Sequence, residues 1–222
     1  MFWAVTIGCW VVAFLLGSIP CGVVIGKAFF GVDPRSGGSG SIGATNSSRM
    51  LGAKGGAAVL VLDMLKGAAA VGVARALCVF AFNLAVGSFE YDMMVFGAVF
   101  FGIAGHIFSP WLGFKGGKGI STGFGTLCTA DWRIGIGLIV VFLIFAVATR
   151  IVSVGSMCAA FSVFVQALVF HGGSVPAVAF SCVIAALVIW AHRSNLGRLI
   201  RHEEPKFSLN KGPKKDQEGK DE

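Results

Sequence analysis

The chain has 222 residues, of which 55% are hydrophobic and only 13% are charged, and its mean hydropathy is +0.81. Soluble domains carry roughly 25% charged residues, so this composition excludes an ordinary soluble protein. Apolar runs recur along the chain, and a membrane-spanning helix needs about 20 such residues. The alternating pattern of a transmembrane β-barrel is absent. We therefore expect an all-α integral membrane protein with one domain, residues 1–205, and a charged, disordered cytoplasmic tail, 206–222.

The net charge of +7 and the six cysteines exclude several other classes of protein. The cysteines lie singly in apolar runs, and none has the Cys-x-x-Cys spacing of a metal or redox site. We therefore expect no metal and no cofactor. The charge follows membrane topology, so it is no evidence for nucleic acid as a partner.

Seven apolar segments are expected to cross the membrane. The first, from about Trp3 to Ile25, lacks the basic start of a cleavable signal and is longer than a signal core. The fourth, Ile120 to Ala130, is too short for a straight crossing unless the glycines before it extend it. The others run from about Gly56 to Val79, Met93 to Leu112, Ile134 to Thr149, Val154 to Phe170 and Val175 to Ala191.

The distribution of basic residues predicts the orientation. Lys27 follows the first segment, which puts the amino terminus outside (periplasmic) and the carboxyl terminus inside (cytoplasmic). Of the 18 Lys and Arg, only Lys66, Arg75 and Arg133 fall in segments that this topology does not place inside. This asymmetry supports the seven-helix arrangement.

Three unusual polar clusters share the inside face in this topology. Gly113–Gly119 combines four glycines with Lys115 and Lys118, which suits a phosphate group but also a flexible inside loop. A Walker A motif would need Gly at 112 and Ser or Thr at 119, where Leu112 and Gly119 stand. The loop alone therefore does not decide between a phosphate cradle and a hinge.

The other two clusters flank this loop in the chain. Gly38–Arg49 reads as a Gly/Ser linker, except that Thr45, Asn46 and Arg49 add donors for an oxyanion. His192–Leu199 fits a basic anchor at a helix end, and its arginines suit that interpretation. However, His192 and Asn195, three apart on one helical face, are not needed for an anchor.

Polar residues within the apolar segments also need partners. Asp63 and Lys66 are three apart and are expected to pair structurally rather than to act in catalysis. His106 is expected to be a packed, hydrogen-bonded histidine. Ser153 and Ser156 begin the sixth segment and are placed to face the inside clusters.

Together the clusters resemble the bacterial acyl-phosphate:glycerol-3-phosphate acyltransferases, the PlsY family. The resemblance covers most of the chain with its spacing preserved. It rests above all on Gly38-Ser39-Gly40, Gly43-Ala44-Thr45-Asn46 with Arg49, Gly113 to Gly119, and His192, Asn195 and Glu204. The chain departs from the family's usual pattern at Ser41, where Asn is usual, at His202, often Gly, and at Pro34.

The resemblance implies an inner-membrane enzyme with its site facing the cytoplasm. It would transfer a fatty acyl group from a long-chain acyl phosphate to the sn-1 hydroxyl of glycerol 3-phosphate, giving lysophosphatidic acid and inorganic phosphate in the first acylation of phospholipid synthesis. A soluble acyl-phosphate synthase would supply the donor, and membrane lipid would surround the enzyme. Catalytic roles carry over to Ser39, Arg49, Lys118, His192 and Asn195, and substrate-binding roles to Thr45, Asn46, Gly116, Gly117, Gly119, Ser156 and Glu204.

The residues are consistent with a mechanism based on positioning. An acyl phosphate is already activated, so phosphate binding and charge stabilisation suffice without a covalent acyl-enzyme. The HxxxxD mechanism of other acyltransferases is excluded, because no His has Asp five residues later. The general base is either His192 or a phosphate oxygen of the substrate. An organic-anion transporter or channel is the alternative function, favoured by the glycine-interrupted short segment, although no inverted repeat is evident and the polar clusters lie at one face.

Overall fold

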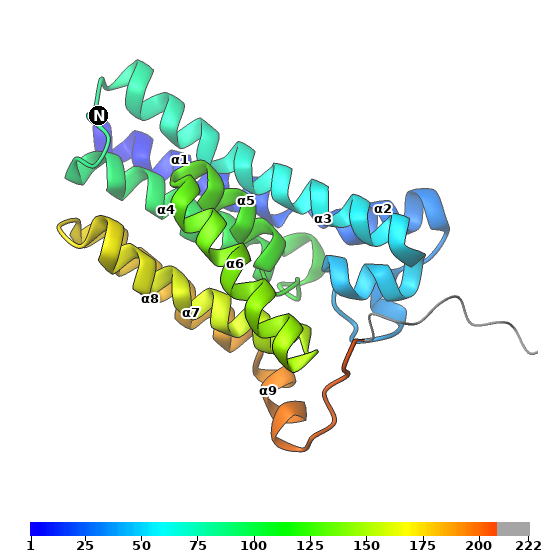
Figure 1. Cartoon of the computed structure of the whole chain (residues 1–222). Coiled ribbons are helices and arrows are strands. Elements are labelled where there is room, and N and C mark those ends of the chain that lie inside the picture. Colours follow the sequence, from blue (N-terminus) through cyan, green and yellow to red (C-terminus); the bar gives the residue numbers. More distant parts are fainter. Residues whose placement is uncertain (208–222) are drawn as a thin grey trace, which may run out of the picture.

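Residues 1–207 are described in a computed structural model, in which every regular element of that range is a helix or helical turn (Figure 1). The predicted charged tail, 206–222, lies outside the described residues except for its first two positions. The α-helices are α1 (Phe2–Ser18), α2 (Cys21–Phe30), α3 (Ala44–Ala76), α4 (Phe89–Ile107), α5 (Ile120–Ala130), α6 (Trp132–Thr149), α7 (Val152–His171), α8 (Val175–Ala191) and α9 (Arg193–Ile200). Short turns are η1 (Pro34–Ser36), the π-helical η2 (Leu77–Ala81) and η3 (Pro110–Leu112).

The long helices form a bundle around α4. This helix packs against α1, α3, α5 and α8, while α6 and α7 pack on each other and α7 packs on α8. Met94, Val95 and Val99 of α4 are fully buried in the core. Within an 18-residue window of the span Phe89–Leu112, 72% of the residues are buried, against 22% for the 18 residues of α6, which leaves most of its apolar side chains facing outward. Such an outward apolar surface fits a lipid environment.

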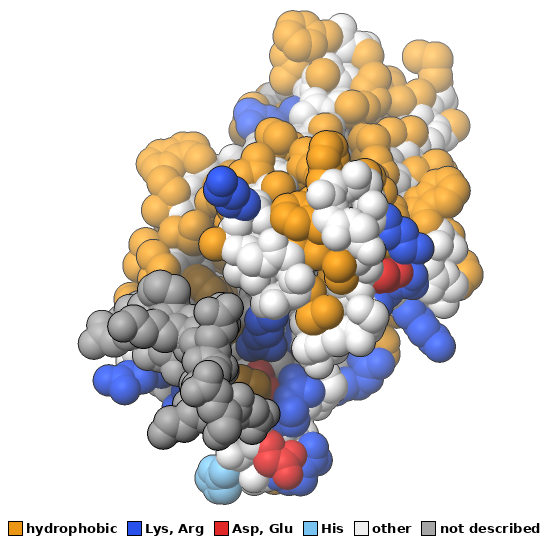
Figure 2. Space-filling model, turned by 90° about the vertical axis from the view of Figure 1, so that its right-hand side faces the viewer, with side chains coloured by type: hydrophobic (Ala, Val, Ile, Leu, Met, Phe, Trp, Pro, Cys, Tyr) orange, Lys and Arg blue, Asp and Glu red, His pale blue; other side chains and the backbone are white. Residues whose placement is uncertain are grey.

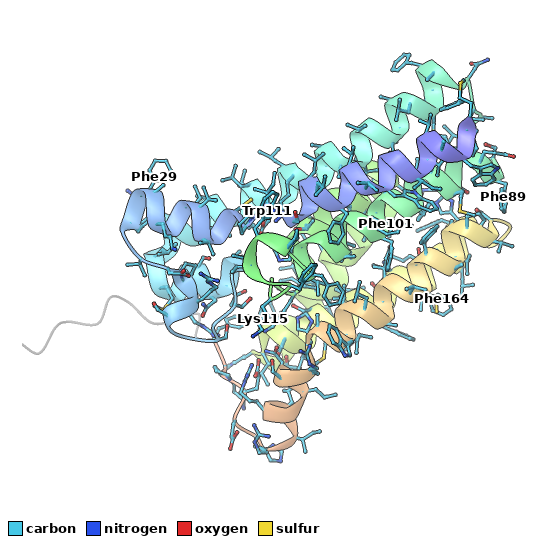
Figure 3. All side chains as sticks on the ribbon, turned by 180° about the vertical axis from the view of Figure 1, so that it is seen from behind. Phe29, Phe89, Phe101, Trp111, Lys115 and Phe164 are labelled. Atoms are coloured by element: carbon cyan, nitrogen blue, oxygen red, sulfur yellow. The ribbon has the colours of Figure 1, made fainter. Side chains whose placement is uncertain are left out.

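The loops separate into two ends of the bundle. Figure 1 places the amino terminus, the α3–α4 connection and the α7–α8 turn at one end, and the α2–α3 connection, the α6–α7 link and α9 at the other. In Figure 3, Phe29 and Phe89 mark these opposite ends, and Lys115 lies on the glycine-rich loop on the side toward α9. All three predicted polar clusters lie on the α9 side.

Within residues 1–207, five helical spans are long and apolar enough to cross a membrane, or six when α8 and the bent α9 are counted as one broken span. The helix α5 has 11 residues and falls below this length. The all-helical, membrane-spanning class is therefore confirmed, whereas seven crossings and the orientation of the termini stay predictions.

The first expected helix, Trp3 to Ile25, is in fact broken. α1 ends at Ser18 and α2 begins at Cys21, with Pro20 between them. Proline has no backbone N–H, so it cannot continue the ladder of hydrogen bonds. The carbonyl of Ile19 instead accepts a hydrogen bond from Lys66 Nζ at 2.6 Å.

The second expected helix starts earlier than predicted, at Ala44 rather than near Gly56. Gly52, with φ 76° and ψ 177°, bends α3, so that Ala44–Leu51 forms a separate arm. Because this arm is helical, Thr45, Asn46 and Arg49 belong to a fixed element and not to a flexible linker. α5 and α8 have the predicted bounds, while α4 ends at Ile107 rather than Leu112.

Candidate active site

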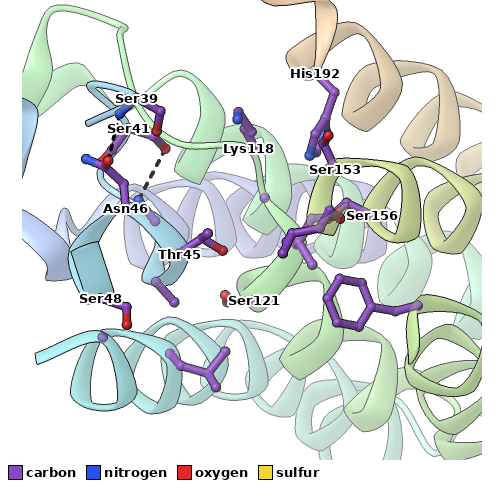
Figure 4. A pocket seen from close by; sticks show the side chains of 18 of the residues that line it. Ser39, Ser41, Thr45, Asn46, Ser48, Lys118, Ser121, Ser153, Ser156 and His192 are labelled. Atoms are coloured by element: carbon purple, nitrogen blue, oxygen red, sulfur yellow. Dashed lines mark hydrogen bonds between the residues drawn. The ribbon is translucent and has the colours of Figure 1, made fainter. Parts of the chain in front are cut away.

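A cavity of about 990 Å³ opens between the arm of α3, the start of α5, α6, α7 and the α8–α9 junction. Its polar part collects side chains from all three predicted clusters (Figure 4). Lys118 stands between Ser39 on one side and His192 on the other. The predicted site residues that line it are Ser39, Thr45, Asn46, Arg49, Lys118, Gly119, Ser156, His192, Asn195 and Glu204. Gly116 and Gly117 do not line it.

Asn46 shapes the first cluster. It is 1% exposed, and its Nδ2 donates to the carbonyls of Pro34 and Ser41 at 2.7 and 2.8 Å, while its Oδ1 accepts from the Ser39 N–H at 2.8 Å. One side chain thus holds the Ser39 loop against α3. Ser41, which departs from the family pattern, accepts from the Gly43 N–H through its own hydroxyl at 3.3 Å. Arg49 follows on the exposed face of the same arm and lines the cavity.

Gly116 and Gly117 have a different environment from the expected cradle. Their N–H groups donate to the carbonyls of Ile107 and His106 at 3.0 and 3.1 Å, so they are already occupied. A Cβ at Gly116 would lie 2.0 Å from the His106 carbonyl oxygen, and one at Gly117 would lie 2.1 Å from His106 Nε2. These glycines let the loop lie directly on the end of α4.

The loop therefore contributes to the cavity through Lys118 and the start of α5. Gly119 is the N-cap of α5, and Gly119, Ile120 and Ser121 line the cavity. The first N–H groups of a helix have no partner within the helix and favour an anion. Within residues 1–207, Lys118 has no carboxylate at salt-bridge distance. Burial, followed by the charge of Arg198, lowers the pKa of Lys118 to about 8.

The third cluster is organised around Glu204. Its carboxylate accepts hydrogen bonds from Asn195 Nδ2 at 2.6 Å, Ser153 Oγ at 2.7 Å and Arg198 Nε at 2.7 Å. Burial by itself would raise the pKa of Glu204, but these hydrogen bonds outweigh it, so the pKa lies below its ordinary value. Glu204 thereby ties α9 to the start of α7. Asn195 keeps a buried Oδ1 without a partner in the described chain.

His192 closes α8 and is 2% exposed. Its Nδ1 lies 2.8 Å from the carbonyl oxygen of Val188. Because a carbonyl oxygen can only accept, Nδ1 carries the hydrogen, and the neutral ring then has its lone pair on Nε2. This is the tautomer that a general base on the cavity wall requires.

Some polar cavity residues were not among the predicted site residues. Arg198 was interpreted as a membrane anchor, yet it lines the cavity beside Glu204. Its spacing of three from Asn195, which repeats the spacing from His192 to Asn195, places all three on one helical face and was the available signal. Ser121 and His106 also line the cavity, and Ser153 does so as its position suggested. No sequence signal distinguishes Ser121 from other small polar residues of the apolar segments.

The wall of the cavity beyond Lys118 is apolar. It is built by α3, α5 and α6 from Ala57, Leu60, Met64, Phe124, Leu138, Ile139, Phe142 and Leu143. Leu60 and Leu143 are 42% and 51% exposed on the outside of the bundle, so this wall continues into the lipid-facing surface. Figure 2, which views the α9 side, shows most of its Lys and Arg in the lower half, below a surface rich in hydrophobic side chains.

The fold and this cavity define an integral membrane protein whose cavity joins a cationic end to an apolar wall. The family model for glycerol-3-phosphate acyltransferases matches residues 7–202, and the chain therefore belongs to that family. The resemblance seen in the sequence is confirmed.

Individual relatives agree with this assignment. A glycerol-3-phosphate acyltransferase of Trichodesmium erythraeum is 42% identical, over 89% of this chain and 90% of the relative. One from Fusobacterium nucleatum is 40% identical, over 90% and 96%. Among solved structures, PlsY, an integral membrane glycerol 3-phosphate acyltransferase, is similar in its glycerol 3-phosphate form with a TM-score of 0.80 and 34% identity, over 91% of this chain and 96% of that one. Its lysophosphatidic acid form has a TM-score of 0.77.

Proposed function

We propose that this protein transfers a fatty acyl group from acyl phosphate to the sn-1 hydroxyl of glycerol 3-phosphate, forming lysophosphatidic acid and inorganic phosphate. The observation that carries this proposal is the continuity of one cavity from a cationic end at Arg49 and Lys118 to an apolar, lipid-facing wall at Leu60 and Leu143. A phosphate with a long acyl chain matches both parts. Glycerol 3-phosphate, which carries no acyl chain, needs only the cationic end.

The two phosphates require two sets of donors. Lys118 and the first N–H groups of α5 hold the phosphate of the acyl donor, next to the apolar wall that takes its chain. Arg49 and the His192–Glu204 region hold glycerol 3-phosphate, with the Ser39 and Thr45 hydroxyls as further donors. Ser156 lines the same cavity, and its hydroxyl donates to the Val152 carbonyl at 3.0 Å. Asn46 acts on this site by fixing the Ser39 loop.

The reaction forms one carbon–oxygen bond and breaks another. The sn-1 hydroxyl oxygen attacks the acyl carbonyl carbon, and the bond from that carbon to the phosphate oxygen breaks, releasing phosphate. The hydroxyl proton passes to His192 Nε2 or to an oxygen of the departing phosphate. Lys118 offsets the negative charge that gathers on the leaving group. No covalent acyl-enzyme is required, because the donor is already a mixed anhydride.

The proposal includes the cellular setting. The enzyme lies in the inner membrane with seven crossings and its cavity on the cytoplasmic side, where glycerol 3-phosphate is available. A soluble acyl-phosphate synthase provides the donor, which enters along the apolar wall from the surrounding lipid.

The test measures phosphate release by the purified protein in liposomes. We expect release from a long-chain acyl phosphate that depends on glycerol 3-phosphate, with lysophosphatidic acid formed in equal amount. Lys118→Ala should abolish transfer while the variant still inserts into the membrane. Transfer retained by Lys118→Ala would contradict the assignment of Lys118. Release without glycerol 3-phosphate would contradict acyl transfer to that acceptor.

A further inference from the structure

A second polar cluster lies directly beneath the glycine-rich loop and has no role in the proposed mechanism. It consists of Asp63 and Lys66 of α3 and His106 of α4, which are 1%, 7% and 2% exposed. Lys66 Nζ lies 2.8 Å from Asp63 Oδ1, which confirms the predicted ion pair. His106 is packed and hydrogen-bonded as predicted, but it also lines the cavity.

Lys66 determines which nitrogen of His106 carries the proton. Besides Asp63, Lys66 Nζ contacts the carbonyl oxygen of Ile19 at 2.6 Å and His106 Nδ1 at 3.0 Å. An ammonium group has hydrogens to donate and no acceptor, so both of these hydrogen bonds are donations and Nδ1 must accept. The hydrogen of the neutral imidazole is therefore on Nε2. A protonated ring would place a second positive charge beside Lys66 with only one carboxylate in the cluster.

The Nε2–H group of His106 points toward the loop that ends in Lys118. A Cβ at Gly117, the residue before Lys118, would lie 2.1 Å from His106 Nε2. Among the described residues, the His106 side chain makes its polar contacts only through Nδ1, on the side of Lys66. Nε2 is thus an unpartnered donor on a nearly buried side chain at the cavity wall.

We propose that His106 is a further phosphate-binding residue, which donates its Nε2–H to the phosphate held by Lys118 and the start of α5. Lys66 is a positioning residue that keeps His106 in the donating tautomer. This inference rests on the proposed function for the identity of that phosphate. It gives the buried Asp63–Lys66 pair a role that a purely structural ion pair would not have.

Two amide variants separate phosphate binding through Nε2 from a role in which His106 only contacts Lys66 through Nδ1. In His106→Gln, the amide reaches the position of Nε2 and can still donate, while in His106→Asn it reaches only the position of Nδ1. The probe is inorganic phosphate, measured as an inhibitor competing with acyl phosphate. A hydrogen bond to a charged group contributes about 1.5 kcal/mol, so we expect His106→Asn to weaken phosphate inhibition about tenfold. His106→Gln should stay within about threefold of the wild type.

The opposite pattern, with His106→Asn unaffected and His106→Gln impaired, would show anchoring to Lys66 alone and overturn the inference, as would two unaffected variants. His202→Asn is the matched control, because His202 is exposed and does not line the cavity. If His106→Asn does not fold, the wild-type protein still decides the question. In its ¹⁵N spectrum the His106 resonance, assigned by its absence from the spectrum of His106→Gln, should report the Nε2–H tautomer and shift on adding phosphate. An Nδ1–H tautomer or an unchanged resonance would overturn the inference.

Lys118→Ala distinguishes a failure of the proposed phosphate site from a failure of the role of His106. If that variant keeps wild-type inhibition by phosphate, the proposed phosphate site itself fails. If Lys118→Ala loses inhibition and His106→Asn keeps it, the site stands and only the role of His106 falls.

Discussion

His192 is buried at the cavity wall with one ring nitrogen already engaged by the Val188 carbonyl. If Nε2 takes the proton from the attacking hydroxyl, His192→Gln should lower kcat by about 10²–10⁴ with a much smaller change in KM. The amide can form hydrogen bonds but cannot accept the proton. Steady-state kinetics with both substrates varied would measure this split. A change confined to KM would instead assign the proton to a phosphate oxygen.

The charge of Lys118 should make the binding of acyl phosphate depend on pH. Burial and the neighbouring Arg198 lower the pKa of Lys118 to about 8, below the ordinary lysine value of 10.5. The charged form is therefore present below about pH 8 and is lost as the pH rises through that value. The KM for acyl phosphate should rise correspondingly above pH 8, measured against spontaneous hydrolysis of the donor.

Lys118→Arg is the control for this effect, since a guanidinium stays charged throughout the range. Its KM should show no rise between pH 7.5 and about 9.5. A wild-type KM that stays flat across the same range would contradict the role of the Lys118 charge in binding the donor.

The sequence predicted most of the polar side chains that line the cavity, because phosphate chemistry restricts the types of side chain that can serve. Lys118, Arg49 and Asn195 follow from charge and from family spacing. The sequence did not show which hydrogen-bond donors are left for the substrate and which are already used within the protein. The N–H groups of Gly116 and Gly117 are used on α4, and Asn46 makes its hydrogen bonds to the Ser39 loop, because these contacts depend on where α3 and α4 end in space.

The glycine-rich loop packs closely over the end of α4. Gly117→Ala would place a Cβ 2.1 Å from His106 Nε2, so the loop must move and carry Lys118 with it. We expect Gly117→Ala to raise the KM for acyl phosphate at least tenfold while the protein still inserts. Kinetics in liposomes and a thermal unfolding curve in detergent would separate binding from stability.

Gly113→Ala provides the matched comparison within the same loop. Gly113 has φ 61° but no atom within 4 Å of an added Cβ, so the change introduces backbone strain without a collision. Left-handed strain costs about 1–2 kcal/mol, and activity should stay close to that of the wild type. Equal loss of activity in both variants would show that backbone strain, rather than contact with His106, governs the loop.

The breaks between and within helices were the least predictable elements, for a physical reason. Hydropathy runs continuously through Pro20, so the first segment reads as one helix even though α1 ends at Ser18. The break is stabilised by Lys66 of α3, a helix distant in sequence, which donates to the Ile19 carbonyl beside the Cys21 N–H. Likewise, residues 44–51 form a helical arm that ends at the bend at Gly52, which the linker-like composition did not indicate. α5 and α8 agree with prediction because polar or glycine residues mark both of their ends.

For the whole molecule, the short helix α5 controls where the cationic end of the cavity lies. Its 11 residues correspond to about 16 Å, roughly half of a hydrocarbon core of about 30 Å. α5 packs tightly on α3, because a Cβ at Gly67 would meet the Thr122 carbonyl at 2.5 Å and one at Gly125 would meet the Met64 carbonyl at 2.0 Å. The α5 start is therefore held inside the bundle, and the loop before it must fold inward to reach that depth.

This geometry makes α5 the segment that decides between six and seven crossings. If it completes a crossing together with its loop, Lys115 and Trp132, both exposed, lie on opposite sides of the membrane. After replacement of the native cysteines, a membrane-impermeant thiol reagent should label Trp132→Cys from the periplasmic side and Lys115→Cys only after permeabilisation. Gly173→Cys and Ser194→Cys, which flank α8, serve as the reference pair and should show the same contrast. Labelling of both α5 positions from one side would contradict seven crossings and make α5 a re-entrant segment.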